Sequence, residues 1–461
     1  MRKLRPYQQE AIDRFLQTPS PHRLFFAHDV GAGKTFTSLM AIGHLELKTL
    51  LIVTPAIVRE NWFREADETF VEGVPVSVIR YGRKRKLSKK LSLQRDAAYK
   101  CRVQIVSYEL LGDINPSGWD AVILDEVHCL RACKSAQSIR VWALLNKNPD
   151  AHVIGLSGTL IPKDPKSVWN PVDTLFPEYL GARTPSNGIA WSFLHRYCVK
   201  ETNAYGTIFK GLREDRAEEL HDKLASISHR VTTQDFASYL PPLYVQPIYI
   251  HDPRPDILSI VKDWYEGIRE DVEHIGVYCH LRETTYDINE MFRHLGYPCY
   301  LITGASEPRE RDMYLTKSRK CERSLIVGTT HALNQGISLS FQKAALVVEW
   351  VTAPDQVIQF IGRFARQDST SNAPTHVQFI VGPNDVGRSE KLCKRIDDIN
   401  TLIKPGTSAT IAQEAFRGQE MGQDEFEASV ERLITGTAKR AQLWGNEDDD
   451  DEETCVEASC Q

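Results

Sequence analysis

Apolar and polar positions alternate in a regular way along the first 165 residues. Residues 4–16, LRPYQQEAIDRFL, carry apolar side chains at the spacing of one helix face, whereas five short apolar runs each end in polar residues or glycine. Apolar runs separated by helical segments predict the buried strands of a parallel sheet with helices on both faces. The five runs cover residues 22–28, 49–55, 101–108, 120–126 and 152–158. Ligands bind such sheets in the loops that follow the strands.

A different pattern occupies residues 166–250 before the alternation returns. This stretch has longer helical or irregular segments rich in aromatic residues, and near its end the consecutive Pro241 and Pro242 indicate a linker. Apolar runs reappear at residues 274–280, 298–304, 323–330, 344–350 and 375–382. We therefore expect an α/β protein with two parallel-sheet lobes and a small helical insert between them. The expected domains are lobe 1 at 1–165, insert and linker at 166–250, lobe 2 at 251–440 and an acidic tail at 441–461.

Charge is distributed unevenly along the 461 residues. The formal charge is −5, but the last 21 residues hold eight acids and no base, and without those acids the chain would carry +3. We expect this tail to be disordered, and it could solvate the protein, recruit a basic protein partner or displace DNA electrostatically from its groove. A basic run, RYGRKRKLSKK at residues 80–90, is compatible with a solvated face, with DNA phosphate contact or with a nuclear targeting signal.

The composition is that of a soluble globular protein, with 42% hydrophobic and 25% charged residues. No apolar run approaches the roughly 18 residues that a membrane span needs. The N-terminus also lacks the apolar region of a secretory signal, so we expect no membrane partner. Among the ten cysteines the closest pairs are Cys129 with Cys133 and Cys455 with Cys460, and neither has a second pair at the spacing of a zinc site. This favours free thiols in a reducing compartment.

A glycine-rich turn follows the first apolar run, in FFAHDVGAGKTFTSLM at residues 25–40. A strand, the spacing GxxxxGK[ST] and a helix together form a phosphate cradle, in which backbone N–H groups face the anion, the lysine contacts the β and γ phosphates and the hydroxyl binds magnesium. Gly33, Lys34 and Thr35 fill the last three positions, while His28 replaces the first glycine. On spacing alone, an ordinary glycine turn with an incidental lysine remains an alternative. The expected nucleotide-binding residues of the turn are Asp29, Val30, Gly31, Ala32, Gly33, Lys34 and Thr35.

Two adjacent acids end another apolar run, in AVILDEVH at residues 121–128. Such a pair is often only a solvated strand end. Combined with the glycine turn, it predicts that Asp125 holds Mg²⁺ together with Thr35, and that Glu126 orients or deprotonates the attacking water. ATP and Mg²⁺ are therefore the expected cofactors.

The order of these motifs resembles superfamily 2 helicases and, among them, the Swi/Snf-type DNA-dependent ATPases, from Leu4 to about Val381. LRPYQQEAI is similar to the adenine-reading Q motif, HDVGAGKT to the phosphate loop, and DEVH to the Asp-Glu-x-His (DEAH-type) box. Further segments resemble the remaining motifs of the family: LIVTPAIVRENW, IVSYELL, LSGTLIP, IGVYCHLRET, GTTHALNQGISLS and QVIQFIGRFARQDS. His28 and Asp29 depart from the acidic pair usual in the family.

The resemblance implies two RecA-like lobes in tandem and assigns further site residues. It places Gln8 on the adenine base, adds Gly336 to the nucleotide-binding residues, and puts Arg363 and Arg366 of the second lobe opposite the phosphates. Thr54, Ser107, Thr303 and Thr329 are the expected contacts to the nucleic-acid backbone, since hydroxyls at strand ends can donate to phosphate oxygens. The segment before residue 243 is similar to annealing helicases of the HARP type at Arg230, Pro241 and Pro242.

Three functions remain open. The first is a DNA-dependent ATPase that translocates on duplex or branched DNA and remodels or anneals it without reading sequence. The second is a strand-separating helicase on DNA or RNA, and the third is an ATP-gated DNA-binding adaptor without significant turnover. We expect a monomer in the cytoplasm of a prokaryote or a virus-infected cell, or in the nucleus if the source is eukaryotic.

Overall fold

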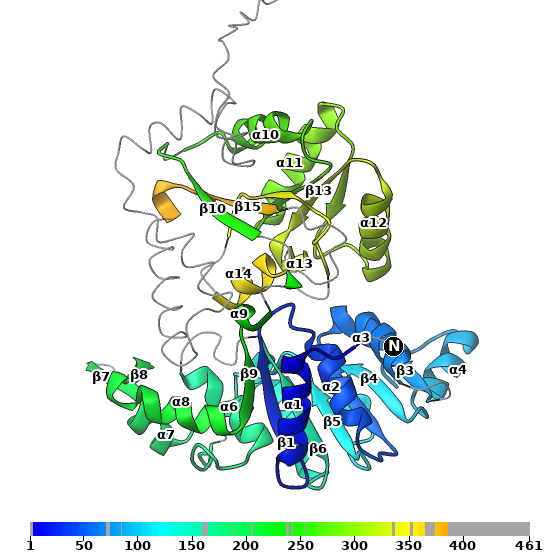
Figure 1. Ribbon diagram of the computed structural model, residues 1–461, viewed down its shortest axis with the longest axis vertical. Helices are drawn as coiled ribbons and strands as arrows, with labels where there is room; N and C mark the ends of the chain where they lie inside the picture. The colour runs from blue at the N-terminus through cyan, green and yellow to red at the C-terminus, as the bar shows by residue number, and fades with distance from the viewer. Residues whose placement is uncertain are drawn as a thin grey trace, which may run out of the picture.

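The computed structural model describes residues 3–70, 74–83, 85–158, 165–186, 188–203, 206–236, 239–240, 243–252, 254–333, 337–350, 354–364 and 374–385. These residues form two α/β lobes, one above the other in Figure 1, each built around one parallel sheet. The architecture confirms the expected pair of tandem RecA-like lobes. The acidic tail, Pro241 and Pro242 lie outside the described residues.

Lobe 1 contains a seven-stranded sheet in which every neighbouring pair is parallel. All five apolar runs expected in this lobe form strands, namely β1, β2, β4, β5 and β6. Because helices cover both faces of the sheet, these strands are largely apolar and are buried along almost their whole length. In spatial order the strands are β3 (Val76–Val78), β4 (Val103–Ser107), β2 (Leu50–Thr54), β5 (Ala121–Leu124), β6 (His152–Leu156), β1 (Arg23–His28) and β9 (Ser228–Val231).

Two hydrophobic clusters lie on the two faces of this sheet. One includes Phe15 and Leu39 from the first two helices and Trp62 from the third, and the other includes Leu144 and Trp169. Each of these side chains is at most 3% exposed, so each contributes roughly 1.5–3 kcal/mol by leaving water. The helices of this lobe are α1 (Pro6–Gln17), α2 (Lys34–Gly43), α3 (Arg59–Thr69), α4 (Lys89–Ala98), α5 (Ala136–Asn146) and α6 (Lys166–Leu175).

The segment expected to be a helical insert is of mixed structure. It contains α7 (Trp191–Tyr197), an antiparallel hairpin of β7 (Cys198–Asn203) and β8 (Gly206–Leu212), α8 (Ala217–Ser226) and the short α9 (Thr233–Phe236). Phe193 and Leu220 belong to a core cluster of lobe 1, so the insert packs against that lobe. Strand β9 also pairs with β1, which places the end of the insert beside the glycine turn.

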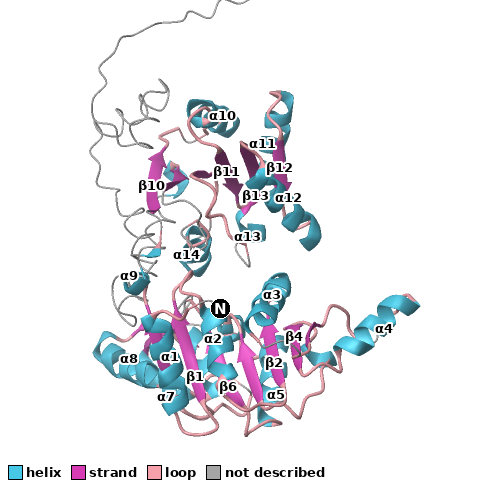
Figure 2. Ribbon diagram, turned by 45° about the vertical axis from the view of Figure 1, so that its right-hand side comes forward, coloured by secondary structure: helices cyan, strands magenta, loops and turns pink. Residues whose placement is uncertain are grey.

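Lobe 2 has a six-stranded parallel sheet, and the five apolar runs expected in this lobe are all strands of it. The order is β10 (Leu243–Tyr249), β15 (Thr375–Val381), β14 (Ala344–Val347), β11 (His274–Cys279), β13 (Ser324–Thr329) and β12 (Cys299–Ile302). The helices are α10 (Ile257–Ile268), α11 (Arg282–His294), α12 (Pro308–Lys320), α13 (Thr330–Leu333) and α14 (Pro354–Ile361). In Figures 1 and 2, α13 and α14 lie on the side of lobe 2 that faces lobe 1.

The described cysteines, seven in number, are all free thiols. None of the helices in the described part of the chain combines the length and the apolar character that crossing a bilayer requires.

Candidate nucleotide site between the lobes

The glycine turn connects β1 to α2 in the manner of a phosphate-binding loop. Gly31 and Gly33 have backbone φ angles of 91° and 78°, a left-handed conformation that residues with a Cβ rarely adopt. Gly33 is the N-cap of α2, so the loop runs directly into the first turn of that helix. Backbone N–H groups at a helix N-terminus favour an anion, and this loop therefore fits a phosphate group.

Lys34 is held over the loop by two backbone carbonyls. Its Nζ donates to the carbonyl oxygens of His28 at 2.8 Å and of Asp29 at 3.3 Å. Burial lowers the pKa of Lys34, and the positive charge of Arg363 lowers it further. The nearby carboxylates of Glu126, Asp125 and Asp29 act in the opposite direction and raise it. The ammonium group is thus fixed at the loop in the position expected of a phosphate ligand.

Two side chains distant in the sequence brace the same loop. Gln8, in α1, donates from Nε2 to the carbonyl of Ala32 at 3.2 Å and accepts from the backbone N–H of Arg5 at 3.0 Å. Arg230, in β9, forms an ion pair with Asp29 at 2.9 Å and donates to the carbonyl of Ala27. The amide of Gln8 is therefore engaged with protein atoms in this structure, and its contact with adenine remains a prediction.

Asp125 follows β5 and receives hydrogen bonds from two other elements. The Thr54 hydroxyl and the Trp62 indole N–H each donate to Oδ2 of Asp125 at 2.8 Å. Tyr108 adds a hydrogen bond of 2.6 Å to the backbone carbonyl of Asp125. Burial, and after it the charge of Glu126, raise the pKa of Asp125, while the two side-chain donors lower it. With one oxygen held by two donors, the carboxylate has a fixed orientation suited to a metal ligand.

Glu126 occupies a strained backbone position next to this carboxylate. Its φ of 51° lies in the left-handed region, which is uncommon for a residue with a side chain. Its Oε2 lies 3.2 Å from Nδ1 of His128. Burial opposes ionisation of Glu126, but His128, Lys34 and Arg363 overcome this and lower its pKa. An ionised carboxylate held in this way is suited to orient a water molecule or accept its proton.

Arg363 brings lobe 2 into the site. It follows α14 and is only 6% exposed, and its backbone carbonyl accepts a hydrogen bond from the N–H of Leu339. Its charge lowers the pKa of both Lys34 and Glu126, so its guanidinium lies within electrostatic range of the lobe 1 residues. The structure therefore brings Lys34, Asp125, Glu126 and Arg363 together. Arg366 and Gly336 lie outside the described residues.

The four hydroxyls expected to touch a nucleic-acid backbone all lie at or just after the carboxyl ends of strands. Thr54, Ser107, Thr303 and Thr329 are between 0% and 3% exposed. Thr54 differs from the expectation, because its hydroxyl is engaged with Asp125 and faces the carboxylate site instead of a surface open to a nucleic acid. The other three remain predicted contacts.

The two aromatic residues that support Asp125 are not among the site residues expected from the sequence. Trp62 is buried as a core residue would be, but its indole N–H serves the carboxylate. Tyr108 lies in the motif-like segment IVSYELL, as Trp62 lies in LIVTPAIVRENW, but neither segment indicates which group the side chain serves. A further clue is that a buried tryptophan or tyrosine usually needs a partner for its polar atom.

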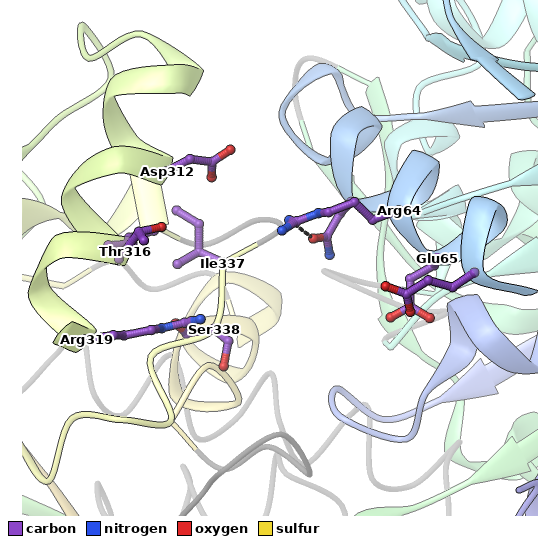
Figure 3. Close-up of a pocket in the computed structure, with 10 residues that line it drawn as sticks. Arg64, Glu65, Asp312, Thr316, Arg319, Ile337 and Ser338 are labelled. Atoms are coloured by element: carbon purple, nitrogen blue, oxygen red, sulfur yellow. Dashed lines mark hydrogen bonds between the residues drawn. The ribbon is translucent and has the colours of Figure 1, made fainter. Parts of the chain in front are cut away.

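A groove of about 350 Å³ lies between the lobes at α3 and α12. Figure 3 shows Arg64 reaching from α3 toward α12, where Asp312, Thr316 and Arg319 line the opposite wall. Arg64 also donates to Asn61 at 2.7 Å, and Arg319 donates to the carbonyl of Ser338 at 2.8 Å. Both signs of charge line this groove, which also includes Glu65 and Glu68.

A phosphate-binding loop, a pair of carboxylates and an arginine from a second lobe define the class of two-lobed proteins that bind a nucleotide between RecA-like lobes. Residues 1–162 match the family model "Type III restriction enzyme, res subunit", and residues 258–368 match "Helicase conserved C-terminal domain". These two domains in this order, together with the relatives described next, support a helicase-like protein of superfamily 2, Swi/Snf type.

The curated relatives are much longer than this chain. The TATA-binding protein-associated factor mot1 of Aspergillus fumigatus is 25% identical over 54% of this chain and 14% of its own length. The TFIIH basal transcription factor complex helicase/translocase XPB subunit of Trypanosoma brucei brucei is 26% identical over 36% of this chain and 18% of its own length. The chain thus spans less than a fifth of either relative. Among solved structures, the Sulfolobus solfataricus SWI2/SNF2 ATPase core in complex with dsDNA aligns over 94% of this chain and 97% of that chain, with 17% identity and a TM-score of 0.43.

Proposed function

We propose that the chain is a DNA-dependent ATPase that binds Mg·ATP between its lobes and couples hydrolysis to translocation on duplex or branched DNA. The observation that carries this proposal is the convergence of Arg363 from lobe 2 with Lys34 and Glu126 from lobe 1. A nucleotide-gated adaptor could use Lys34, Asp125 and Arg363 for binding alone, but it would need no ionised carboxylate such as Glu126 to accept a proton from water.

The residues of the cleft fit Mg·ATP and divide its chemistry among them. The loop from Asp29 to Gly33 cradles phosphate oxygens with backbone N–H groups, and Lys34 adds a fixed positive charge. Thr35 and Asp125 would hold Mg²⁺, which supplies charge neutralisation on the phosphates when it is bound. Glu126 orients the attacking water and accepts its proton.

Arg363 links this chemistry to the relative position of the lobes. Its guanidinium is always charged and can bind two phosphate oxygens at once. Because it belongs to lobe 2, it completes the site only while the cleft is closed, and opening of the cleft removes it. If both lobes also hold DNA, alternation between these two states moves the protein along the strand. One relative is named as a helicase/translocase subunit of a transcription factor complex, which supports translocation and also keeps strand separation as the alternative.

The decisive experiment compares ATPase rates without nucleic acid and with single-stranded DNA, duplex DNA, forked DNA and RNA. We expect the largest stimulation with duplex or forked DNA and no separation of a tailed duplex. Separation of the tailed duplex would favour the strand-separating helicase. A Glu126→Gln protein that hydrolysed ATP as fast as the wild type would remove Glu126 from the reaction and revive the nucleotide-gated adaptor.

A further inference from the structure

The largest concentration of positive charge in the chain lies outside this site. Between Arg80 and Arg102 the sequence has ten lysines or arginines and one acid, Asp96, so this stretch carries +9 whereas the whole chain carries −5. Its central described part, residues 80–83 and 85–98, comprises the loop after β3 and helix α4, and we call it the basic arm. In Figures 1 and 2, α4 projects from the edge of lobe 1 near β3 and β4.

The helix of the basic arm contributes no buried surface to the fold. Helix α4 has no buried residue, and Leu93 is 64% exposed. Lys89 and Lys90 occupy its first turn, which contains no acid. A cation at a helix N-terminus meets the positive end of the helix dipole, at a cost of roughly 0.3–1 kcal/mol, so helix stability alone would favour acids there.

The loop of the arm is held in one shape by its own arginines. The guanidinium of Arg95 donates to the carbonyls of Arg83 at 2.8 Å and of Arg85 at 3.3 Å. The Arg83 guanidinium lies 4.4 Å from the centre of the Tyr99 ring, and that of Arg85 lies 5.2 Å from the Tyr81 ring. Arg95 also pairs with Asp96 at 2.9 Å, and Arg80 pairs with an acid of α3, so these two charges are compensated. The structure shows no ion pair for Arg83, Arg85, Lys86, Lys89 and Lys90 among the described residues, and a cationic surface ordered in this way binds a polyanion at a lower entropic cost than a disordered one.

The arm is fixed at its base to the helix that lines the inter-lobe groove. Arg80 forms a two-pronged ion pair with Glu60 of α3, at 2.8 and 2.7 Å, and Arg59 donates to the carbonyl of Ile79 at 2.6 Å. Later residues of the same helix, from Asn61 to Glu68, form one wall of the groove. A polyanion that extends past α3 therefore meets the arm.

We propose that the basic arm is a second contact for duplex DNA, which holds the phosphate backbone outside the cleft between the lobes. The choice of DNA as the polyanion rests on the proposed function, whereas the affinity of the arm for a polyanion does not. Each neutralised phosphate releases condensed counterions, so a binding surface of this kind appears directly in the salt dependence of the affinity. The contact reads no sequence, because it is made to phosphates.

The test uses two triple variants of the full chain with the same change in charge. The arm variant is Lys86→Gln/Lys89→Gln/Lys90→Gln, and the control is Lys134→Gln/Lys147→Gln/Lys200→Gln. All six lysines are exposed, and the control lysines lie beside α5 and on β7. Nucleotide-free binding to a blunt duplex is measured between roughly 50 and 200 mM salt, where each phosphate contact contributes about 0.9 to the logarithmic slope.

We expect the arm variant to lower the steepness of the slope by about 3, corresponding to three lost contacts, and the control to lower it by less than about 1. Circular dichroism and the thermal midpoint verify that both variants are folded. An arm variant with the wild-type slope would overturn the proposal while leaving the proposed function intact, and equal losses in both variants would reduce the effect to net charge. If the arm variant kept the wild-type slope and its C-terminal acidic segment were cleaved by protease sooner than that of the wild type, the arm would bind the acidic segment instead of DNA. Absence of duplex binding by the wild type would remove the proposed function as well.

Discussion

The hydrogen bond from Thr54 to Asp125 makes a sharp prediction about magnesium. Valine has nearly the same shape as threonine and lacks only the hydroxyl, so Thr54→Val removes one of the two side-chain donors to Asp125 and leaves the indole of Trp62 in place. Thr54 is 0% exposed, so water cannot replace the lost donor. A hydrogen bond to a charged group contributes about 1.5–3 kcal/mol, which corresponds to roughly 10- to 150-fold in an equilibrium constant.

We therefore expect Thr54→Val to raise the magnesium concentration for half-maximal ATPase activity by roughly 10-fold or more, consistent with the effect of losing a group that orients a metal ligand. Thr54→Ser is the matched control, because it keeps the hydroxyl and loses a methyl group worth about 0.8 kcal/mol of burial. The assay is a magnesium titration of the ATPase rate at fixed ATP, together with urea unfolding of each protein.

The two variants separate a role in metal binding from a role in packing. The serine variant is expected to be less stable than wild type but to retain its magnesium dependence, whereas the valine variant is expected to change the magnesium dependence most. Equal magnesium half-saturation for the Thr54→Val protein and the wild type would refute the reasoning. A Trp62→Phe change in addition to Thr54→Val is expected to be non-additive, because both donors serve the same oxygen.

Three further predictions concern other parts of the site. Arg363→Ala is expected to lower the ATPase rate by about 10³-fold or more with little change in nucleotide affinity, measured by single-turnover kinetics, and loss of binding instead would contradict it. Burial, aided by His229, Lys34 and Arg230, lowers the pKa of His28 below 6.5, so the unfolded state takes up this proton first as the pH falls. The free energy of unfolding therefore decreases below about pH 6.5, by at most about 1.4 kcal/mol per pH unit. In urea unfolding, the stability of His28→Gln should depend less on pH than that of the wild type, and an unchanged pH dependence would contradict this prediction. Arg230→Met leaves the Asp29 carboxylate buried without its ion-pair partner, at an expected cost of about 3 kcal/mol in unfolding free energy. Adding Asp29→Asn should recover most of that loss, and no recovery would assign the loss to packing.

Much of the fold was predictable because buried strands appear in the sequence as short runs of apolar residues. All ten apolar runs are strands of the two sheets, since a parallel strand covered on both faces is largely apolar. The short β9, with the sequence SHRV, has polar residues at three of its four positions and produced no such run. It is a strand because it pairs with β1, and the local sequence of β9 carries no information about this distant partner.

The sequence by itself determined the parts of the site that lie within one motif. The left-handed glycines and Lys34 come from one turn, and Asp125 and Glu126 are neighbours at one strand end, so their proximity needs no tertiary information. Two of the distant partners of these groups were decided by strand order. Strand β2 lies beside β5 with Val53 opposite Leu124, which brings Thr54 to Asp125, and β9 lies beside β1, which brings Arg230 to Asp29. A threonine hydroxyl or an arginine guanidinium can bind any carboxylate that it reaches, so the residue type does not specify the partner. The folded arrangement of the strands decides which carboxylate lies within reach.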